Sequence, residues 1–223
     1  MRSAAGKTLA IVWKDITSEM RTKEIATSLI AFALLVIVVV SFTLEPGENT
    51  SPIAAGILWV AFTFAGVLGL SRSFATEKDK GCLQGLMLCP VDRSILYLGK
   101  MLSIVVFMIV VEIIIIPIFI VLLDQSGFPP QLAVIALLAT IGFAAVGTLF
   151  SAMAVNTRAR EVMMPLLFLP VASPVIIAAI KSTALVLSGG SWGDIASWLG
   201  VMAAFDAIFL AVSPLVFEFV IEE

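Results

Sequence analysis

The chain has 223 residues, of which 61% are hydrophobic and only 13% are charged, and its net charge is −3. Soluble domains carry about 25% charged residues, so this chain has too little charge to cover a surface that faces water. Most of its exterior must therefore face lipid. This composition excludes a secreted domain, a nucleic-acid-binding protein and a cytosolic enzyme.

Residues 1–25 differ from the rest of the chain, and we expect them to form a helix in the membrane interface. Leu9, Trp13, Ile16 and Met20 recur at the spacing of one face of a helix. Charged residues fall largely elsewhere around the same helix. Such a helix buries its apolar face at headgroup depth and turns its basic residues toward anionic lipid. The alternative is a polar tail that folds only against other parts of the protein.

Apolar stretches long enough to cross a bilayer as helices fill most of the remaining chain. Turn-forming sequences rich in Gly, Pro, Ser and Asn separate several of them. We therefore expect an all-α polytopic membrane protein, in which residues 26–223 form a six-span domain. The six expected transmembrane helices are Ala26–Leu44, Pro52–Leu70, Met101–Leu123, Gln131–Val155, Val162–Ile180 and Trp198–Val220.

The positions of lysine and arginine predict how the chain is oriented. Of the 13 Lys and Arg residues, all but Lys181 lie in the N-terminal segment or in the second and fourth connections between spans. These three regions lie on one side of a six-span protein. Because cytoplasmic loops carry the excess of Lys and Arg, we expect both termini to be cytoplasmic.

Two carboxyl groups, Glu112 and Asp206, fall within predicted spans. A charge at mid-bilayer costs a few kcal/mol unless it is paired, protonated or facing a wet cavity. One interpretation is a polar lining of a pathway or a hydrogen-bonded latch between spans. The other is a protonated carboxyl group that bonds a neighbouring Ser or a backbone carbonyl, and the sequence leaves both open.

The sequence offers no catalytic or metal-ligating set. It contains no His, the commonest general base and metal ligand, and the spacing of Cys82 and Cys89 fits no zinc, redox or haem-attachment motif. Gly6-Lys7-Thr8 ends like a phosphate loop, but the first Gly that the motif requires is absent. Any ATP chemistry must therefore come from another chain.

The second connection, from Arg72 to Lys100, is the longest expected on the cytoplasmic side. Leu83, Leu86 and Met87 are spaced as one apolar face of a helix of about two turns, and Pro90 ends it. Such a short helix is marginal alone in water and needs a surface to lie against. That surface is either a partner protein or the chain's own bundle.

This connection contains the pattern E-x-x-x-G-x-L-x-x-L-x-x-x-P, which resembles the permeases of ABC-2-type exporters. A more particular likeness covers almost the whole chain. The chain resembles the CcmB family, the membrane subunit of the cytochrome c maturation haem exporter. The segments that carry this resemblance are PIAAGILWVA at 52–61, GTLF at 147–150, NTRARE at 156–161 and PLLFLP at 165–170.

The resemblance implies a permease subunit in the bacterial inner membrane that is not itself an enzyme. It implies a CcmA-type ATPase on the cytoplasmic loops, CcmC- and CcmD-type membrane subunits and a CcmE-type haem chaperone, with a second copy of the chain left open. It implies no cofactor bound by this chain, with haem as the handled species and ATP on the partner. The expected ATPase-coupling residues are Glu77, Gly81, Leu83, Leu86, Pro90, Arg158, Arg160 and Glu161.

Two alternatives remain at this point. One is an ABC-2-type exporter permease for another substrate. The other is a self-contained secondary transporter, which would need more paired intramembrane charge and inverted repeats.

Overall fold

The structure is a computed structural model that describes residues 4–42, 51–79, 92–122, 129–154 and 160–222. These residues form seven α-helices joined by turns, which confirms the all-α prediction for this part of the chain. The helices are α1 (Ala4–Thr22), α2 (Glu24–Ser41), α3 (Ser51–Asp79), α5 (Arg93–Leu122), α6 (Pro130–Ala154), α7 (Arg160–Leu187) and α8 (Trp192–Glu222).

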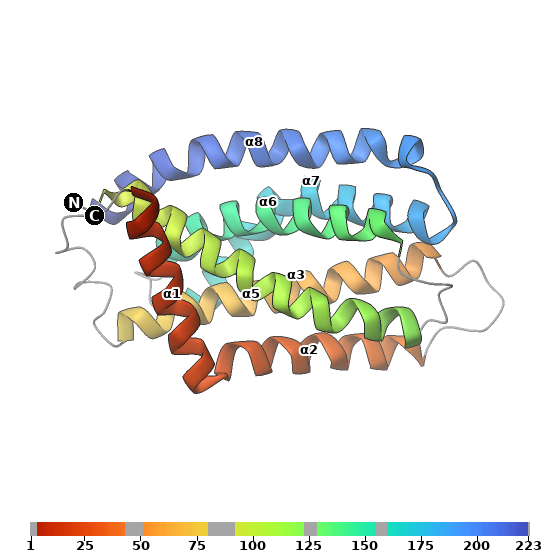
Figure 1. The fold of residues 1–223 in the computed structure, drawn as a ribbon, viewed down its shortest axis with the longest axis horizontal. Helices are drawn as coiled ribbons and strands as arrows, with labels where there is room; N and C mark the ends of the chain where they lie inside the picture. The colour runs from red at the N-terminus through yellow and green to blue at the C-terminus, as the bar shows by residue number, and fades with distance from the viewer. Residues whose placement is uncertain (1–3, 43–50, 80–91, 123–128, 155–159, 223) are drawn as a thin grey trace.

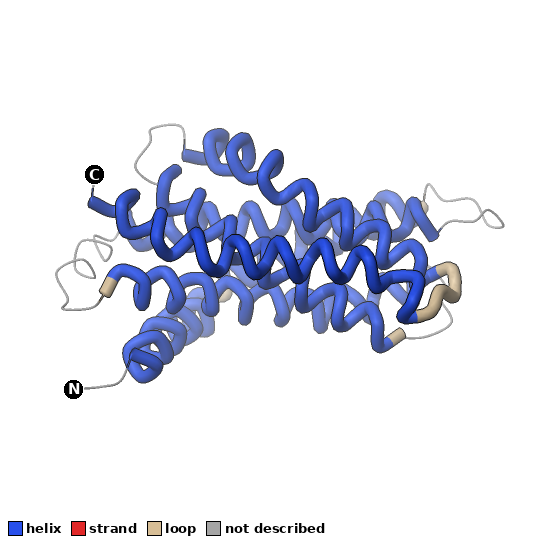
Figure 2. The backbone as a smooth tube through the Cα atoms, turned by 90° about the horizontal axis from the view of Figure 1, so that it is seen from above, coloured by secondary structure: helices blue, strands red, loops and turns tan. Residues whose placement is uncertain are grey.

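Six of these helices run along the long axis of an elongated bundle, and α1 crosses one end of it (Figure 1). The six long helices alternate in direction, so the described N- and C-terminal ends lie at the end that carries α1 (Figures 1 and 2). An α-helix satisfies its backbone hydrogen bonds internally, as the lipid interior requires. These helices are also apolar along most of their length. The bundle therefore has the architecture of a polytopic membrane protein.

Among the residues that the structure describes, five helices are long and apolar enough to cross a membrane, and they correspond to the second to sixth predicted spans. Their apolar stretches are Ser51–Arg72, Arg93–Leu122, Pro130–Ala154, Met163–Leu187 and Trp192–Val220. The first predicted span corresponds to α2, which reaches the same criterion only together with α1 across a bend of 71°. Five apolar helices of spanning length are thus observed, and the sixth span stays a prediction.

Several helices extend beyond the predicted spans. The helix α5 begins at Arg93 instead of Met101, and α7 continues past Ile180 to Leu187. We had placed Lys100 and Lys181 in connections, but both lie inside helices because a single Lys does not end a helix. The predicted turn after α7 is correct: Gly189 adopts a φ of +84°, which costs glycine little.

The helix α6 occupies the centre of the bundle and packs most extensively against α7 and α8. In its apolar stretch 72% of the residues are buried, whereas the value for α8 is 22%. Small residues allow this close packing, because they let the backbones of neighbouring helices approach one another. Within lipid no hydrophobic driving force holds helices together, so such close van der Waals contacts matter more. The small buried residues of α6 are Ala136, Ala139, Thr140, Gly142, Ala144, Ala145, Gly147, Thr148, Ser151, Ala152 and Ala154.

A sharp elbow joins α1 to α2. Lys23 lies between the two helices with a φ of 56°, a left-handed conformation that is uncommon for a residue with a side chain. The Glu19 carboxylate accepts a hydrogen bond from the backbone N–H of Ala26 at 2.8 Å. Because the first N–H groups of a helix have no partner within the helix, Glu19 caps α2 and fixes the direction in which α1 leaves it.

Candidate functional site

The helix α1 has two different faces. Leu9, Trp13 and Met20 are 68%, 72% and 71% exposed, and Ile16 is half-buried. On the opposite side Ile11 and Val12 are buried, and so are two acids, Asp15 and Glu19. The predicted stripe therefore lies mainly on the side that faces away from the bundle. The two acids lie apart from the apolar stripe, as their spacing predicts, and they face the bundle.

Asp15 joins α1 to α5 through an ion pair. Its carboxylate contacts the ammonium group of Lys100 at 3.0 Å and that of Lys14 at 3.1 Å. Lys100 is only 2% exposed and Asp15 only 8%. Lys100 had been counted as a charge of the second connection, but it is the buried counter-ion of an acid on α1.

Next to this ion pair the two helices approach very closely. A Cβ atom placed on Gly99 would lie 2.8 Å from the Cβ atom of Ile11, which is shorter than any ordinary contact between carbon atoms. Glycine is therefore required at position 99 for α1 to lie this close to α5. The ion pair and this steric contact occupy adjacent residues of α5.

In the interior of the bundle, Glu112 of α5 faces Thr140 of α6. The Thr140 hydroxyl donates a hydrogen bond to the Glu112 carboxyl group, and Glu112 is only 5% exposed. The interaction links two helices, as a latch would. The partner of the carboxyl group is a threonine of the neighbouring helix, whereas the sequence suggests a Ser or a backbone carbonyl as the partner.

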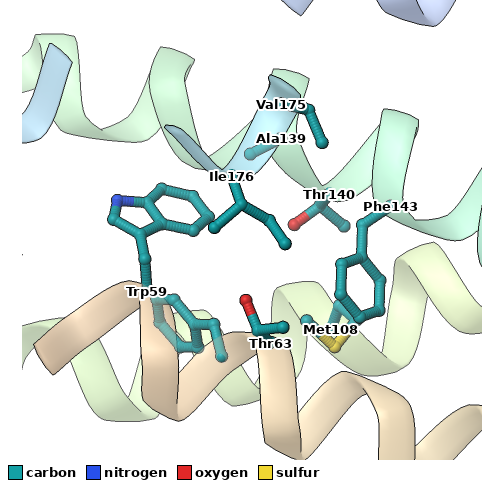
Figure 3. Close-up of a pocket in the computed structure, with 9 residues that line it drawn as sticks. Trp59, Thr63, Met108, Ala139, Thr140, Phe143, Val175 and Ile176 are labelled. Atoms are coloured by element: carbon teal, nitrogen blue, oxygen red, sulfur yellow. The ribbon is translucent and has the colours of Figure 1, made fainter. Parts of the chain in front are cut away.

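Thr140 also lines a small cavity where α3, α5, α6 and α7 meet (Figure 3). Thr63 and Thr140 direct their hydroxyl groups toward it, and Trp59, Met108 and Phe143 supply apolar walls. The indole N–H of Trp59 donates to the Thr183 hydroxyl at 2.9 Å. The cavity volume of about 10 Å³ suits about one water molecule, so a porphyrin does not fit there in this conformation.

Asp206 of α8 is the second buried acid, and its surroundings differ from those of Glu112. It is 6% exposed, and neither carboxylate oxygen has a hydrogen-bond partner among the residues that the structure describes. A Cβ atom on Gly142 of α6 would collide with its Oδ1 atom and would lie 3.1 Å from the Phe205 ring. A buried polar group without a hydrogen-bond partner lowers the stability of the fold. Asp206 is therefore a candidate functional residue of α8.

Most of the predicted ATPase-coupling residues cannot be placed. Gly81, Leu83, Leu86, Pro90 and Arg158 lie outside the described residues. Glu77 lies in the last turn of α3, and Arg160 and Glu161 begin α7. The end of α3 and the start of α7 lie at the end of the bundle that carries α1 (Figure 1).

Together these observations define a polytopic helical membrane protein with a crossing helix at one end and buried acids between its helices. The sequence model of one family, described as CcmB protein, matches residues 6–222. The chain therefore belongs to the CcmB family, which confirms the resemblance found in the sequence.

Curated relatives match over similar lengths. Heme exporter protein B of Rhodobacter capsulatus is 31% identical over 188 residues, which cover 83% of this chain and 84% of the relative. The protein of the same name from Paracoccus denitrificans is 30% identical over 187 residues, covering 83% and 84%. That of Pseudomonas aeruginosa is 27% identical over 201 residues, covering 87% and 86%.

Proposed function

We propose that this chain is the membrane permease subunit of a haem exporter for cytochrome c biogenesis. The observation that carries the proposal is the match to the CcmB family over residues 6–222, together with relatives named Heme exporter protein B that align over most of both chains. The bundle of apolar helices fits a subunit that works inside a membrane. On this proposal the chain is not an enzyme, and haem is what the complex handles.

ATP hydrolysis takes place on a separate CcmA-type chain, and this subunit converts it into haem export or into release of the haem-loaded chaperone. The ATPase docks on the segment that runs from the end of α3 to the next helix and includes Glu77, Gly81, Leu83, Leu86 and Pro90. It also docks on the shorter segment that leads into α7 and includes Arg158, Arg160 and Glu161. The helices next to both connections end or begin at the same end of the bundle, which supports a shared docking region. CcmC- and CcmD-type subunits and a CcmE-type chaperone complete the complex.

The proposed topology has six spans in the bacterial inner membrane and both termini in the cytoplasm. Residues 1–25 then form an interfacial helix and residues 26–223 the permease domain. The angle between α1 and α2 suits a helix that lies along the membrane surface beside one that crosses it. The exposed Leu9, Trp13 and Met20 give α1 the apolar face that the headgroup region accepts.

Cysteine labelling tests this topology. A single Cys introduced at Asn49 or Ser126, in a background without Cys82 and Cys89, is expected to react with an impermeant maleimide added to intact cells from the periplasmic side. Both positions follow helices that end at the bundle end opposite α1. Labelling that occurs only after the membrane is opened would contradict the proposed orientation.

The two buried acids are expected to differ in importance. Asp206→Asn should lower the yield of c-type cytochromes more than Glu112→Gln, with both proteins present at normal abundance. The amide oxygen of Gln at position 112 can still accept the Thr140 hydrogen bond. Asp206 lacks such a partner among the described residues, and its short side chain cannot reach out of the apolar layer. Wild-type yields from both variants would remove the functional interpretation and leave a packing role.

Deletion and complementation test the proposed function itself. Cells that lack this chain should fail to assemble c-type cytochromes, and a plasmid-borne copy should restore them. Haem synthesis and b-type cytochromes should be normal, because the proposed defect concerns haem delivery. Normal c-type cytochromes in the deletion strain would overturn the proposal and would favour an exporter of another substrate.

A further inference from the structure

We propose that Asp15 and Lys100 are positioning residues that fasten α1 to α5, so that the crossing helix and the beginning of α5 move as one body. The claim that this ion pair transmits movement from the ATPase to α1 rests on the proposed function. The docking of α1 against α5 is argued from the geometry alone. The buried ion pair, the close contact beside it and the position of both within the bundle support this role.

The ion pair is too deeply buried to serve only as a surface charge. Lys100 is 2% exposed, and its ammonium group lies 3.0 Å from the Asp15 carboxylate. A lysine that merely marked the cytoplasmic side would extend its long side chain into water. Removing one partner of a buried pair is strongly destabilising, whereas apolar residues in place of both are often tolerated. Lys14 also contacts the Asp15 carboxylate at 3.1 Å, but it is 43% exposed and lies on α1 itself, so it does not join the two helices. The pair therefore makes docking of α1 depend on both Asp15 and Lys100.

Two further contacts turn the ion pair into a rigid joint. Gly99, the neighbour of Lys100, lets Ile11 approach so closely that a Cβ atom at position 99 would lie 2.8 Å away. At the far end of α1, Glu19 caps α2 through the backbone N–H of Ala26. The helix α1 is thus held against α5 near its middle and against α2 at its end.

The contacts between α1 and α5 lie close to the connection on which the proposed ATPase docks. The helix α5 begins at Arg93, directly after the long connection that the proposed function assigns to the ATPase. Lys100 lies about two helical turns further along. A displacement of the start of α5 therefore carries α1 with it, and the outward side chains of α1, including Trp13, move relative to the membrane surface.

Thiol protection measures the docking directly. In a background without Cys82 and Cys89, Ile11→Cys places a thiol on the buried side of α1, and Ser18→Cys serves as the reference because Ser18 is exposed and lies opposite the apolar stripe of the helix. The rate of maleimide labelling in membranes should be much lower at position 11 than at position 18. Either Asp15→Leu or Lys100→Met should raise the rate at position 11 by roughly tenfold, since a tenfold change corresponds to about 1.4 kcal/mol of docking.

The double variant Asp15→Leu/Lys100→Met provides the matched control. Because it removes both charges, it should restore the protection of the thiol and the abundance of the protein, even if the single variants insert poorly. The proposed role of the ion pair in docking would be wrong if the single variants left the protection of the thiol unchanged. It would also be wrong if the double variant restored neither the protection of the thiol nor the abundance of the protein.

The yield of c-type cytochromes then shows whether docking of α1 against α5 is needed to transmit movement from the ATPase. It should fall in the single variants at equal abundance and recover in the double variant. Lost protection with a normal cytochrome yield would overturn the role in transmission, but it would leave the proposed function intact. That function fails only if deletion of the whole chain leaves cytochrome maturation normal.

Discussion

Replacing Leu83 and Leu86 together by alanine is expected to abolish co-purification of the partner ATPase and, with it, cytochrome c maturation. The two leucines form most of the apolar face predicted for the connection before α5. An apolar face of this kind binds a partner by filling a groove on it. At about 25 cal/mol per Å² of apolar surface, its loss should cost at most several kcal/mol of docking free energy. The measurement is the amount of ATPase recovered with the tagged chain.

Lys78→Ala is the control for this experiment, because solvent-facing ion pairs contribute little to binding. It should leave both co-purification and cytochrome yield nearly unchanged. The double leucine variant must reach normal abundance in the membrane, since neither leucine lies in a span predicted from the sequence. If it still recovers the ATPase at wild-type yield, docking depends on another element, and the connection at 156–161 becomes the next candidate.

Gly142→Ala is expected to loosen the contact between α6 and α8. The added methyl group would collide with the Oδ1 atom of Asp206 and crowd the Phe205 ring. Overpacking of an interior typically costs about 1–3 kcal/mol, which for a chain of this size corresponds to a fall of about 2–4 °C in apparent Tm per kcal/mol. Thermal unfolding of the purified protein in detergent measures the change.

Two variants show whether this effect comes from the predicted collision. Gly56→Ala adds the same methyl group at a position where no atom of another helix among the described residues lies within 4 Å, so it should be neutral or stabilise its helix by up to about 1 kcal/mol. Asp206→Ala in the Gly142→Ala background removes the colliding carboxylate and should recover part of the loss. An unchanged Tm in Gly142→Ala would show that α8 does not lie against α6 as described.

The sequence predicted the apolar helices well because their signal is local. Long hydrophobic runs and the turn around Gly189 are visible without any knowledge of packing, and the structure contains both. The predicted helix ends are less accurate: the prediction bounds two spans at Lys100 and Lys181, whereas α5 and α7 continue through these residues. Charge alone does not decide where a helix ends.

The contacts between helices could not be predicted in the same way. Asp15 and Lys100 are 85 residues apart, and only the fold shows that they form a buried pair. The sequence indicates that Glu112 and Asp206 are unusual, but their different surroundings depend on which residue of α6 lies opposite each acid, Thr140 or Gly142. One signal was available: Lys100 directly precedes an apolar stretch, where a lysine that does not reach water requires an acidic partner.

The most direct test of the central claim is purification of the tagged chain together with its native partners, followed by addition of ATP. We predict that an ATPase chain co-purifies with it and that ATP turnover releases haem-loaded chaperone from the complex or moves haem across the membrane. A chain that purifies without any ATPase, or a complex whose haem and chaperone do not respond to ATP, would contradict the account.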